Sequence, residues 1–185
     1  MVQGRIGYFS DMAASPLLAS GLCVYAFHSF TRVALIEWSF VTAFGGLLWT
    51  LIEYLVHRMV YHRVAFLTKY HEGHHADPRA YVGAPPLFGT SLVFLISFIP
   101  LLTVDMVLAD AISVGMLLGY TAYMLVHHGC HHWTPTRGSY LYRARVRHAA
   151  HHYRSKEANF GVTTSLWDRA FATHLQSACD WAGRN

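Results

Sequence analysis

The sequence has little charge. Only 13% of its 185 residues are Asp, Glu, Lys or Arg, whereas 54% are hydrophobic. Such a composition excludes a disordered chain, which buries too little apolar surface to fold. The net charge of +4 is modest for a nucleic-acid-binding protein, so we expect no nucleic-acid partner. The length suits one domain, and no Pro-rich or Ser-rich linker divides residues 1–185.

Cysteine is also scarce. The chain has three cysteines, Cys23, Cys130 and Cys179, and no C-x-x-C spacing. Neither a disulfide framework nor a thiolate zinc site is indicated. Histidine, by contrast, occurs 14 times, as often as Lys and Arg together. Any metal chemistry of this chain must therefore use imidazole.

Four hydrophobic runs approach the roughly 17 to 25 residues that a transmembrane helix needs. They are residues 12–30, 38–56, 87–104 and 111–126, and Glu53 is the one charged residue inside them. Asp105 and Asp110 fall between the last two runs, where we expect the chain to reverse. Helices that are apolar on all sides also occur in the cores of soluble bundles. The placement of the basic residues decides between these two interpretations.

If all four runs cross a bilayer, 13 of the 14 Lys and Arg residues lie on one side and only Arg32 lies on the other. This asymmetry is the positive-inside pattern, which makes the basic side cytoplasmic. We therefore predict an all-α, multi-pass integral membrane protein with four transmembrane helices in two hairpins. Both termini and the segments 57–86 and 127–174 would be cytoplasmic, and the two segments would form a helical cap.

Twelve of the histidines form four groups on the predicted cytoplasmic side. The groups are His57 and His62; His71, His74 and His75; His127, His128, His131 and His132; and His148, His151 and His152. Two groups repeat the spacing H-x-x-H-H, which places three imidazoles on one face of a helix. His28 and His174 join no group, and we expect them to be ordinary surface or hydrogen-bonded residues.

The first pair has a different spacing. His57 and His62 are five residues apart, which turns them roughly 140° from each other on an ideal α-helix. Their convergence requires the helix to end or loosen near residues 59–61. Each half of the chain supplies one pair of histidines from a predicted membrane helix and one H-x-x-H-H triplet, which makes ten imidazoles. Ten exceed the six positions of an octahedral metal ion, so the pattern indicates two ions. Imidazole binds iron, zinc, copper and nickel, and ligand type alone does not choose among them.

Five segments, in this order, carry a family resemblance. They are Glu53-Tyr-Leu-Val-His-Arg58, His71-Glu-Gly-His-His75, the run from Tyr123 to His132, His148-Ala-Ala-His-His-Tyr153 and Asn159-Phe-Gly-Val-Thr-Thr-Ser-Leu-Trp-Asp168. The set resembles the membrane-bound fatty acid hydroxylase and sterol desaturase superfamily over roughly residues 53–173. The last segment is similar to the one that follows the final histidines of fatty acid 2-hydroxylases.

The resemblance implies a four-helix membrane domain under a cytoplasmic cap that holds two non-haem iron ions. Zinc can occupy the same sites in a purified protein. The implied activity is hydroxylation of an unactivated C–H bond of a lipid, first of all of a fatty-acyl chain, with dioxygen and external electrons. We find no cytochrome b5-like segment, and we expect a separate electron donor such as cytochrome b5 or ferredoxin with its reductase. The implied metal ligands are His57, His62, His71, His74, His75, His127, His131, His148, His151 and His152.

Other residues are expected near these ligands. His128 and His132 are candidates to lie just outside them. Neutral imidazoles cannot offset the charge of two cations, so carboxylates should also be close. Glu53 lies four residues before His57 on the same helix face, inside a predicted membrane helix where an unpaired carboxylate is costly. We predict that Glu53 hydrogen-bonds a ligand imidazole, with Asp168 as a second candidate.

Three alternatives stay open. The first is a sterol or carotenoid hydroxylase or desaturase of the same superfamily. The second is a zinc metalloprotease, because His71-Glu72-x-x-His75 matches H-E-x-x-H, with Glu72 as the general base. That interpretation leaves three of the four histidine groups unexplained. The third is a non-catalytic metal-binding membrane protein, although carriers usually place their ligands near the middle of the bilayer.

Overall fold

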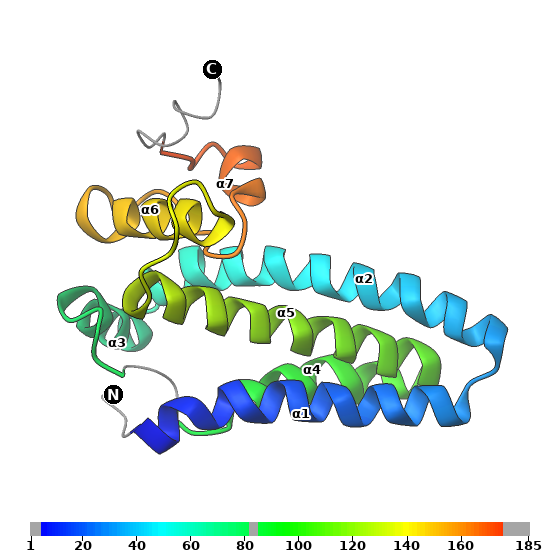
Figure 1. Ribbon diagram of the computed structural model, residues 1–185. Helices are drawn as coiled ribbons and strands as arrows, with labels where there is room; N and C mark the ends of the chain where they lie inside the picture. Colours follow the sequence, from blue (N-terminus) through cyan, green and yellow to red (C-terminus); the bar gives the residue numbers. More distant parts are fainter. Residues whose placement is uncertain (1–4, 82–84, 176–185) are drawn as a thin grey trace. The chain divides into compact units, whose positions relative to one another are not determined.

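The computed structural model describes residues 5–81 and 85–175, and every regular element in them is a helix. The order is α1 (Arg5–Ser29), α2 (Arg32–Leu55), the π-helix η1 (Val56–Tyr61), α3 (Ala65–Ala76), α4 (Phe88–Leu102), α5 (Met106–His132), α6 (Tyr140–Tyr153) and α7 (Leu166–Ala170) (Figure 1). The predicted all-α class is confirmed. Cys23 and Cys130 are free thiols, and Cys179 lies outside the described residues.

The chain forms two compact units. Unit 1 comprises Met1–Trp49 and Tyr81–Ala122, and unit 2 comprises Thr50–Ala80 and Tyr123–Asn185. Unit 1 therefore holds α1, α4 and the greater part of α2 and α5. Unit 2 holds η1, α3, α6, α7 and the last residues of α2 and α5. The chain passes from one unit to the other three times: within α2, between Ala80 and Tyr81, and within α5.

Two helical stretches in the described part of the chain are long and apolar enough to cross a membrane. They are Arg32–Tyr61, which joins α2 to η1, and Met106–His132, which is α5. Helix α4 is equally apolar but shorter, with 15 residues. The prediction of four spans is therefore supported for two helices and stays a prediction for the others.

Polar side chains join the helices of unit 1. The Asp11 carboxylate on α1 accepts a hydrogen bond from Thr90 N at 3.0 Å, which caps the first turn of α4. Ser15 Oγ donates to Leu117 O at 3.0 Å, and Ser97 Oγ donates to Ser113 Oγ at 2.9 Å. Short side chains of this kind let apolar helices approach closely and hold them together.

Asp110 is not in the turn where we expected it. Helix α5 begins at Met106, so Asp105 precedes its first turn and accepts a hydrogen bond from Leu108 N at 2.8 Å. Asp110 lies on α5 itself and is fully buried. Its Oδ1 accepts a hydrogen bond from Trp38 Nε1 on α2 at 2.6 Å, and this partner is what permits a carboxylate at that position. Helix α5 thus begins five residues before the predicted run 111–126, and it continues six residues beyond the end of that run.

Glycines set the closest approach between α2 and α5 in unit 1. A Cβ built on Gly45 would lie 2.8 Å from Ile112 O, whereas one on the next residue, Gly46, would meet its nearest atom, Gly115 O, at 3.7 Å. We therefore expect Gly45→Ala to push the helices apart and destabilise the protein by about 1–3 kcal/mol. Gly46→Ala is the matched control and should be neutral or slightly stabilising. Thermal unfolding in detergent measures both, and equal stability of the two variants would contradict the prediction.

In unit 2, the chain loosens where the histidine spacing required it. Residues 56–61 form a π-helix, whose hydrogen bonds join residues five apart instead of four. His57 and His62 thereby come to the same side, with ring centroids 5.2 Å apart. The prediction of a loosened helix near residues 59–61 is confirmed, and the loosening begins three residues earlier.

The other elements of unit 2 present histidines at helical spacing. Helix α3 carries His71, His74 and His75, and α6 carries the second H-x-x-H-H segment. Ser139 caps α6, because its side chain accepts a hydrogen bond from Tyr142 N at 3.2 Å. After α6 the chain forms a loop that returns to α7. Asn159 in this loop has a positive φ of 55°, which asparagine tolerates better than most residues.

Candidate metal centre

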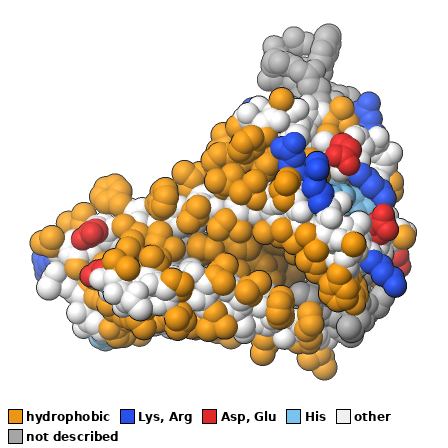
Figure 2. Space-filling view, turned by 180° about the vertical axis from the view of Figure 1, so that it is seen from behind, with side chains coloured by type: hydrophobic (Ala, Val, Ile, Leu, Met, Phe, Trp, Pro, Cys, Tyr) orange, Lys and Arg blue, Asp and Glu red, His pale blue; other side chains and the backbone are white. Residues whose placement is uncertain are grey.

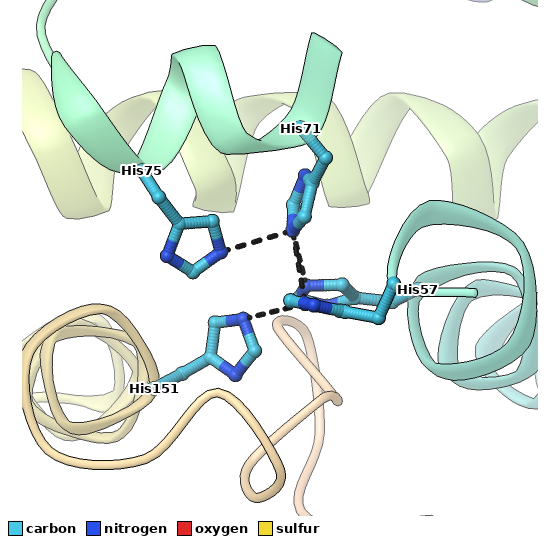
Figure 3. Close-up of side chains that lie close together, drawn as sticks. His57, His71, His75 and His151 are labelled. Atoms are coloured by element: carbon cyan, nitrogen blue, oxygen red, sulfur yellow. Dashed lines mark hydrogen bonds between the residues drawn. The ribbon is translucent and has the colours of Figure 1, made fainter. Parts of the chain in front are cut away.

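Five imidazoles from η1, the residue that follows it, α3 and α6 form one group, which we call the five-histidine group: His57, His62, His71, His75 and His151. Figure 3 shows four of them, His57, His71, His75 and His151, pointing toward one another. His71 Nε2 lies 3.1 Å from the Nε2 atoms of His57, His62 and His75, and His62 Nε2 lies 3.1 Å from His151 Nε2. All five rings therefore present the same nitrogen to one point.

A second set of imidazoles forms the four-histidine group: His74, His131, His148 and His152. His148 Nε2 lies 2.8 Å from His131 Nε2 and 3.1 Å from His152 Nε2. His127 borders this group, since its Nε2 lies 3.1 Å from that of His74. The two groups adjoin, because the rings of His75 and His152 stack with centroids 4.2 Å apart. The structure thus brings all ten predicted ligands together.

The donor atoms fit metal ions. A neutral imidazole nitrogen that carries no proton repels another one at 3.1 Å, and a single shared proton cannot relieve three such contacts at His71 Nε2. A cation at the centre of the group satisfies all of them. Two nitrogens at neighbouring positions of an octahedral metal ion, with bonds of about 2.05 Å, lie about 2.9 Å apart. The spacings of 2.8–3.1 Å in both groups are close to that value.

Electrostatics keeps these imidazoles neutral, which is the form that binds metal. Burial, together with the neighbouring imidazoles, lowers the pKa of His75 to about 3 and that of His152 to about 2. Burial also lowers the pKa of His74 and of His151 to about 4. The pKa of His71 and that of His148 fall well below the ordinary value for the same reason. Near pH 7 the lone pairs at both groups are therefore available.

Two imidazoles of the five-histidine group are oriented by backbone carbonyls. His57 Nδ1 lies 2.6 Å from Phe160 O, and His151 Nδ1 lies 2.8 Å from Ala158 O. A carbonyl only accepts, so each Nδ1 must carry the proton and each Nε2 is left free to bind. The buried Phe160 ring also packs against both imidazoles, with centroids 5.7 and 5.6 Å away.

Two buried carboxylates hold the loop that supplies these carbonyls. Glu53 Oε1 accepts hydrogen bonds from Val162 N at 2.7 Å and Thr163 N at 2.9 Å, and Glu53 Oε2 accepts one from Thr163 Oγ1 at 2.6 Å. Asp168 Oδ1 and Oδ2 accept from Phe160 N and Gly161 N, each at 2.8 Å. Four consecutive backbone N–H groups thus donate to two side chains.

This arrangement corrects the predicted contact of Glu53. The Glu53 carboxylate meets the loop and not an imidazole, and Asp168 does the same. The reason is that the tight loop points its N–H groups at the carboxylates and its carbonyls at the histidines. Sequence analysis missed Ala158 and Phe160, because their backbone carbonyls leave no mark on residue type. The one available signal was the resemblance of the segment 159–168 to fatty acid 2-hydroxylases.

The remaining histidines lie outside both groups. His128 and His132 stack on each other, with centroids 4.3 Å apart. His28 is exposed on α1, and His174 joins neither group.

The geometry of the H-E-x-x-H segment does not match a zinc protease site. His71 and His75 share their site with three further histidines, and Glu72 is exposed. A zinc protease site needs three protein ligands and a glutamate beside the metal.

A pocket of about 280 Å³ reaches the four-histidine group. His131, His148 and His152 line it, together with Arg79 and Arg145 among others. The pocket is thus a route by which small molecules can approach these three imidazoles. Among the described residues that line this pocket, none belongs to the five-histidine group.

The fold and the two groups define a helical protein with a histidine-built candidate dimetal centre. A model of the fatty acid hydroxylase family matches residues 42–173, so the chain belongs to that family. It is 33% identical over 171 residues to fatty acid 2-hydroxylase of Rattus norvegicus, covering 83% of this chain and 46% of that protein. It is also 33% identical to a dihydroceramide fatty acyl 2-hydroxylase of Arabidopsis thaliana, covering 72% and 60%.

A solved structure described as full-length scs7p, with only the hydroxylase domain visible, has the same fold. The TM-score is 0.78 at 25% identity, and the match covers 92% of this chain and 67% of that one. The chain spans less than half of the rat protein that it matches. The activities named for these relatives belong to those longer proteins.

Proposed function

We propose that this protein is an oxidoreductase that hydroxylates a fatty-acyl chain of a lipid at an iron pair. The observation that carries the proposal is the convergence of nine imidazoles in two adjoining groups, with His127 beside the second group and the Nε2 atoms directed inward. The names of the relatives support the substrate class, since they are fatty acid 2-hydroxylases and ceramide fatty acyl hydroxylases. Sterol or carotenoid oxidation remains the alternative within the superfamily.

Each histidine group would bind one of the two metal ions. The five-histidine group would hold one, and the four-histidine group with His127 would hold the other. Bound iron supplies the reduction of dioxygen to an oxidant strong enough to attack an unactivated C–H bond, which no side chain provides. The overall reaction takes one substrate C–H, one O2, two electrons and two protons, and gives one C–OH and one water. Zinc can fill the same ligand set without supporting this redox chemistry.

The chain's own groups prepare the site. The carbonyls of Ala158 and Phe160 hold the Nδ1 protons of His151 and His57, so their Nε2 atoms point inward. The buried ring of Phe160 covers one side of these imidazoles and keeps water from it. The electrons would come from a separate protein such as cytochrome b5 or ferredoxin with its reductase.

We also propose a multi-pass membrane location, with both termini and the histidine groups on the cytoplasmic side. Large apolar side chains on α2 are exposed, among them Val33, Ile36, Phe40 and Phe44. Figure 2 shows hydrophobic side chains over much of unit 1, and most of the Lys and Arg side chains in this view over unit 2, with a few charged side chains at one end of unit 1. Contiguous apolar surface of this kind suits lipid contact better than water.

The proposal is tested by lipid mass spectrometry. We expect membranes that contain the iron-loaded protein, a reductant system and isotopically labelled dioxygen to gain fatty-acyl species with one labelled oxygen atom. The product should be absent without oxygen or without the reductant. The matched control is the same protein loaded with zinc, which should be inactive. Labelled sterols with unlabelled acyl chains would overturn the proposed substrate class.

A further inference from the structure

The two histidine groups differ in how their outer nitrogens are held. In the five-histidine group, carbonyls of the loop 158–164 fix the Nδ1 atoms of His57 and His151. In the four-histidine group, the buried Nδ1 atoms of His148 and His152 have no hydrogen-bond partner within the described residues, and in the five-histidine group the same holds for His75 Nδ1. A partner on the outer nitrogen fixes the tautomer and the ring direction and makes the imidazole a stronger ligand. The first group is therefore the better prepared for a metal ion.

The loop itself has little freedom. Its N–H groups from Phe160 to Thr163 donate to Asp168 and Glu53, neither of which touches an imidazole in the contacts above. A Cβ on Gly161 would lie 2.1 Å from Thr164 O and 2.9 Å from Asp168 Oδ2, so only glycine fits between the carboxylate and the loop. Displacement of the carboxylate would therefore move the carbonyls that face His57 and His151.

The two groups also differ in their access to the pocket at the protein surface. The pocket described above is lined by three of the four imidazoles in the four-histidine group. Water or a chelator can reach an ion there. None of the five imidazoles in the five-histidine group lines this pocket: His57 and His151 are buried and pack against Phe160, whereas His62, His71 and His75 are half-buried.

We infer that the two metal sites are not equivalent: the five-histidine site is the tighter one, and Asp168 and Glu53 are positioning residues for that site alone. The inference rests on the proposed function only in assuming that each group binds an ion. The carboxylates act on His57 and His151 through the loop carbonyls, and they have no corresponding contact with the four-histidine group in the described residues. The predicted consequence is a protein that keeps one ion more firmly than the other.

The test measures each site alone, with Co²⁺ as the probe. His148→Ala disables the four-histidine group and leaves the five-histidine site, whereas His71→Ala does the reverse. We expect Asp168→Asn to weaken Co²⁺ binding about 10- to 100-fold in the His148→Ala protein. We expect a change of less than about threefold in the His71→Ala protein. The amide keeps the shape of the side chain but places an NH2 group against one backbone donor, which disturbs the loop without opening a cavity.

The matched control is Glu157→Gln. Glu157 is an exposed carboxylate in the same connection, and the loop N–H groups donate to Asp168 and Glu53 instead of Glu157, so this variant tests the loss of charge without loss of the loop contacts. It should leave both Co²⁺ affinities nearly unchanged. The Co²⁺ absorption bands should shift with Asp168→Asn only at the five-histidine site, which a general loss of stability would not produce.

Three results would overturn the inference. They are equal weakening at both sites, no weakening at the five-histidine site, and a Co²⁺ ion that leaves the His148→Ala protein for a chelator as fast as it leaves the His71→Ala protein. If Asp168→Asn does not fold, Thr163→Val removes one hydrogen bond to Glu53 Oε2 and should show the same selectivity at smaller size. These measurements use no lipid, so a failed hydroxylation assay would leave their outcome intact.

Discussion

His71→Ala and His148→Ala should each reduce the metal content from two ions per chain to one and abolish lipid hydroxylation. His71 Nε2 contacts three other donors of the five-histidine group, and His148 Nε2 contacts two donors of the four-histidine group. Removal of either leaves a vacancy at the centre of its group. Because loss of a residue that merely supports a ligand costs 10- to 100-fold, loss of a ligand should reduce activity by more than about 100-fold. Metal analysis and product formation measure the two effects.

The control for this result is His28→Ala. His28 is exposed on α1 and joins neither group, so its loss should leave both metal content and activity unchanged. If His71→Ala or His148→Ala kept two ions per chain, the assignment of the two groups to two metals would be wrong. If both kept full activity with one ion, the reaction would not need an iron pair.

The metal-free protein should lose stability as the pH falls from about 7 to about 5. The pKa of His74 and that of His151 are lowered to about 4 by burial, and that of His75 to about 3, whereas the unfolded chain titrates near 6.5. Between these values the unfolded state binds more protons than the folded state. Stability is therefore full above pH 6.5 and decreases as the pH falls toward 4. Burial raises the pKa of Asp168, which acts in the direction opposite to that of the histidines.

Thermal unfolding of chelator-treated protein at several pH values measures this effect. His74→Asn combined with His151→Asn removes two of the responsible groups and should flatten the dependence. Excess metal should raise the unfolding temperature at each pH, because the ion binds the folded state. An unfolding temperature that stays constant from pH 7 to pH 5 in the metal-free protein would contradict the expected titration.

Much of the site could be predicted because helical spacing carries direct geometric information. The repeated H-x-x-H-H segments had to present three imidazoles on one face, and α3 and α6 do so. The five-residue step from His57 to His62 required a loosened helix, and η1 provides it. The division of the ligands into groups of five and four could not be predicted, since it separates neighbours such as His74 and His75.

The role of the loop could not be predicted either. Glu53 was expected beside an imidazole because residues four apart share a helix face, but its hydrogen bonds go to Val162 and Thr163, more than 100 positions later in the chain. Contacts of that range depend on how the loop folds back, and backbone donors are the same for every residue type. Asp110 was misplaced for a related reason, since its partner Trp38 lies on another helix.

The π-helix η1 has a consequence for how the chain can change in length. A π-turn holds one residue more than an α-turn, so deletion of a single residue from 58–61 would let this segment become an ordinary α-turn. His57 and His62 would then be four residues apart, about 40° from each other on an α-helix, and His62 would stay on the side of the five-histidine group. A one-residue deletion should therefore be tolerated in this turn, whereas a deletion of two residues would turn His62 by about a further 100° relative to His57.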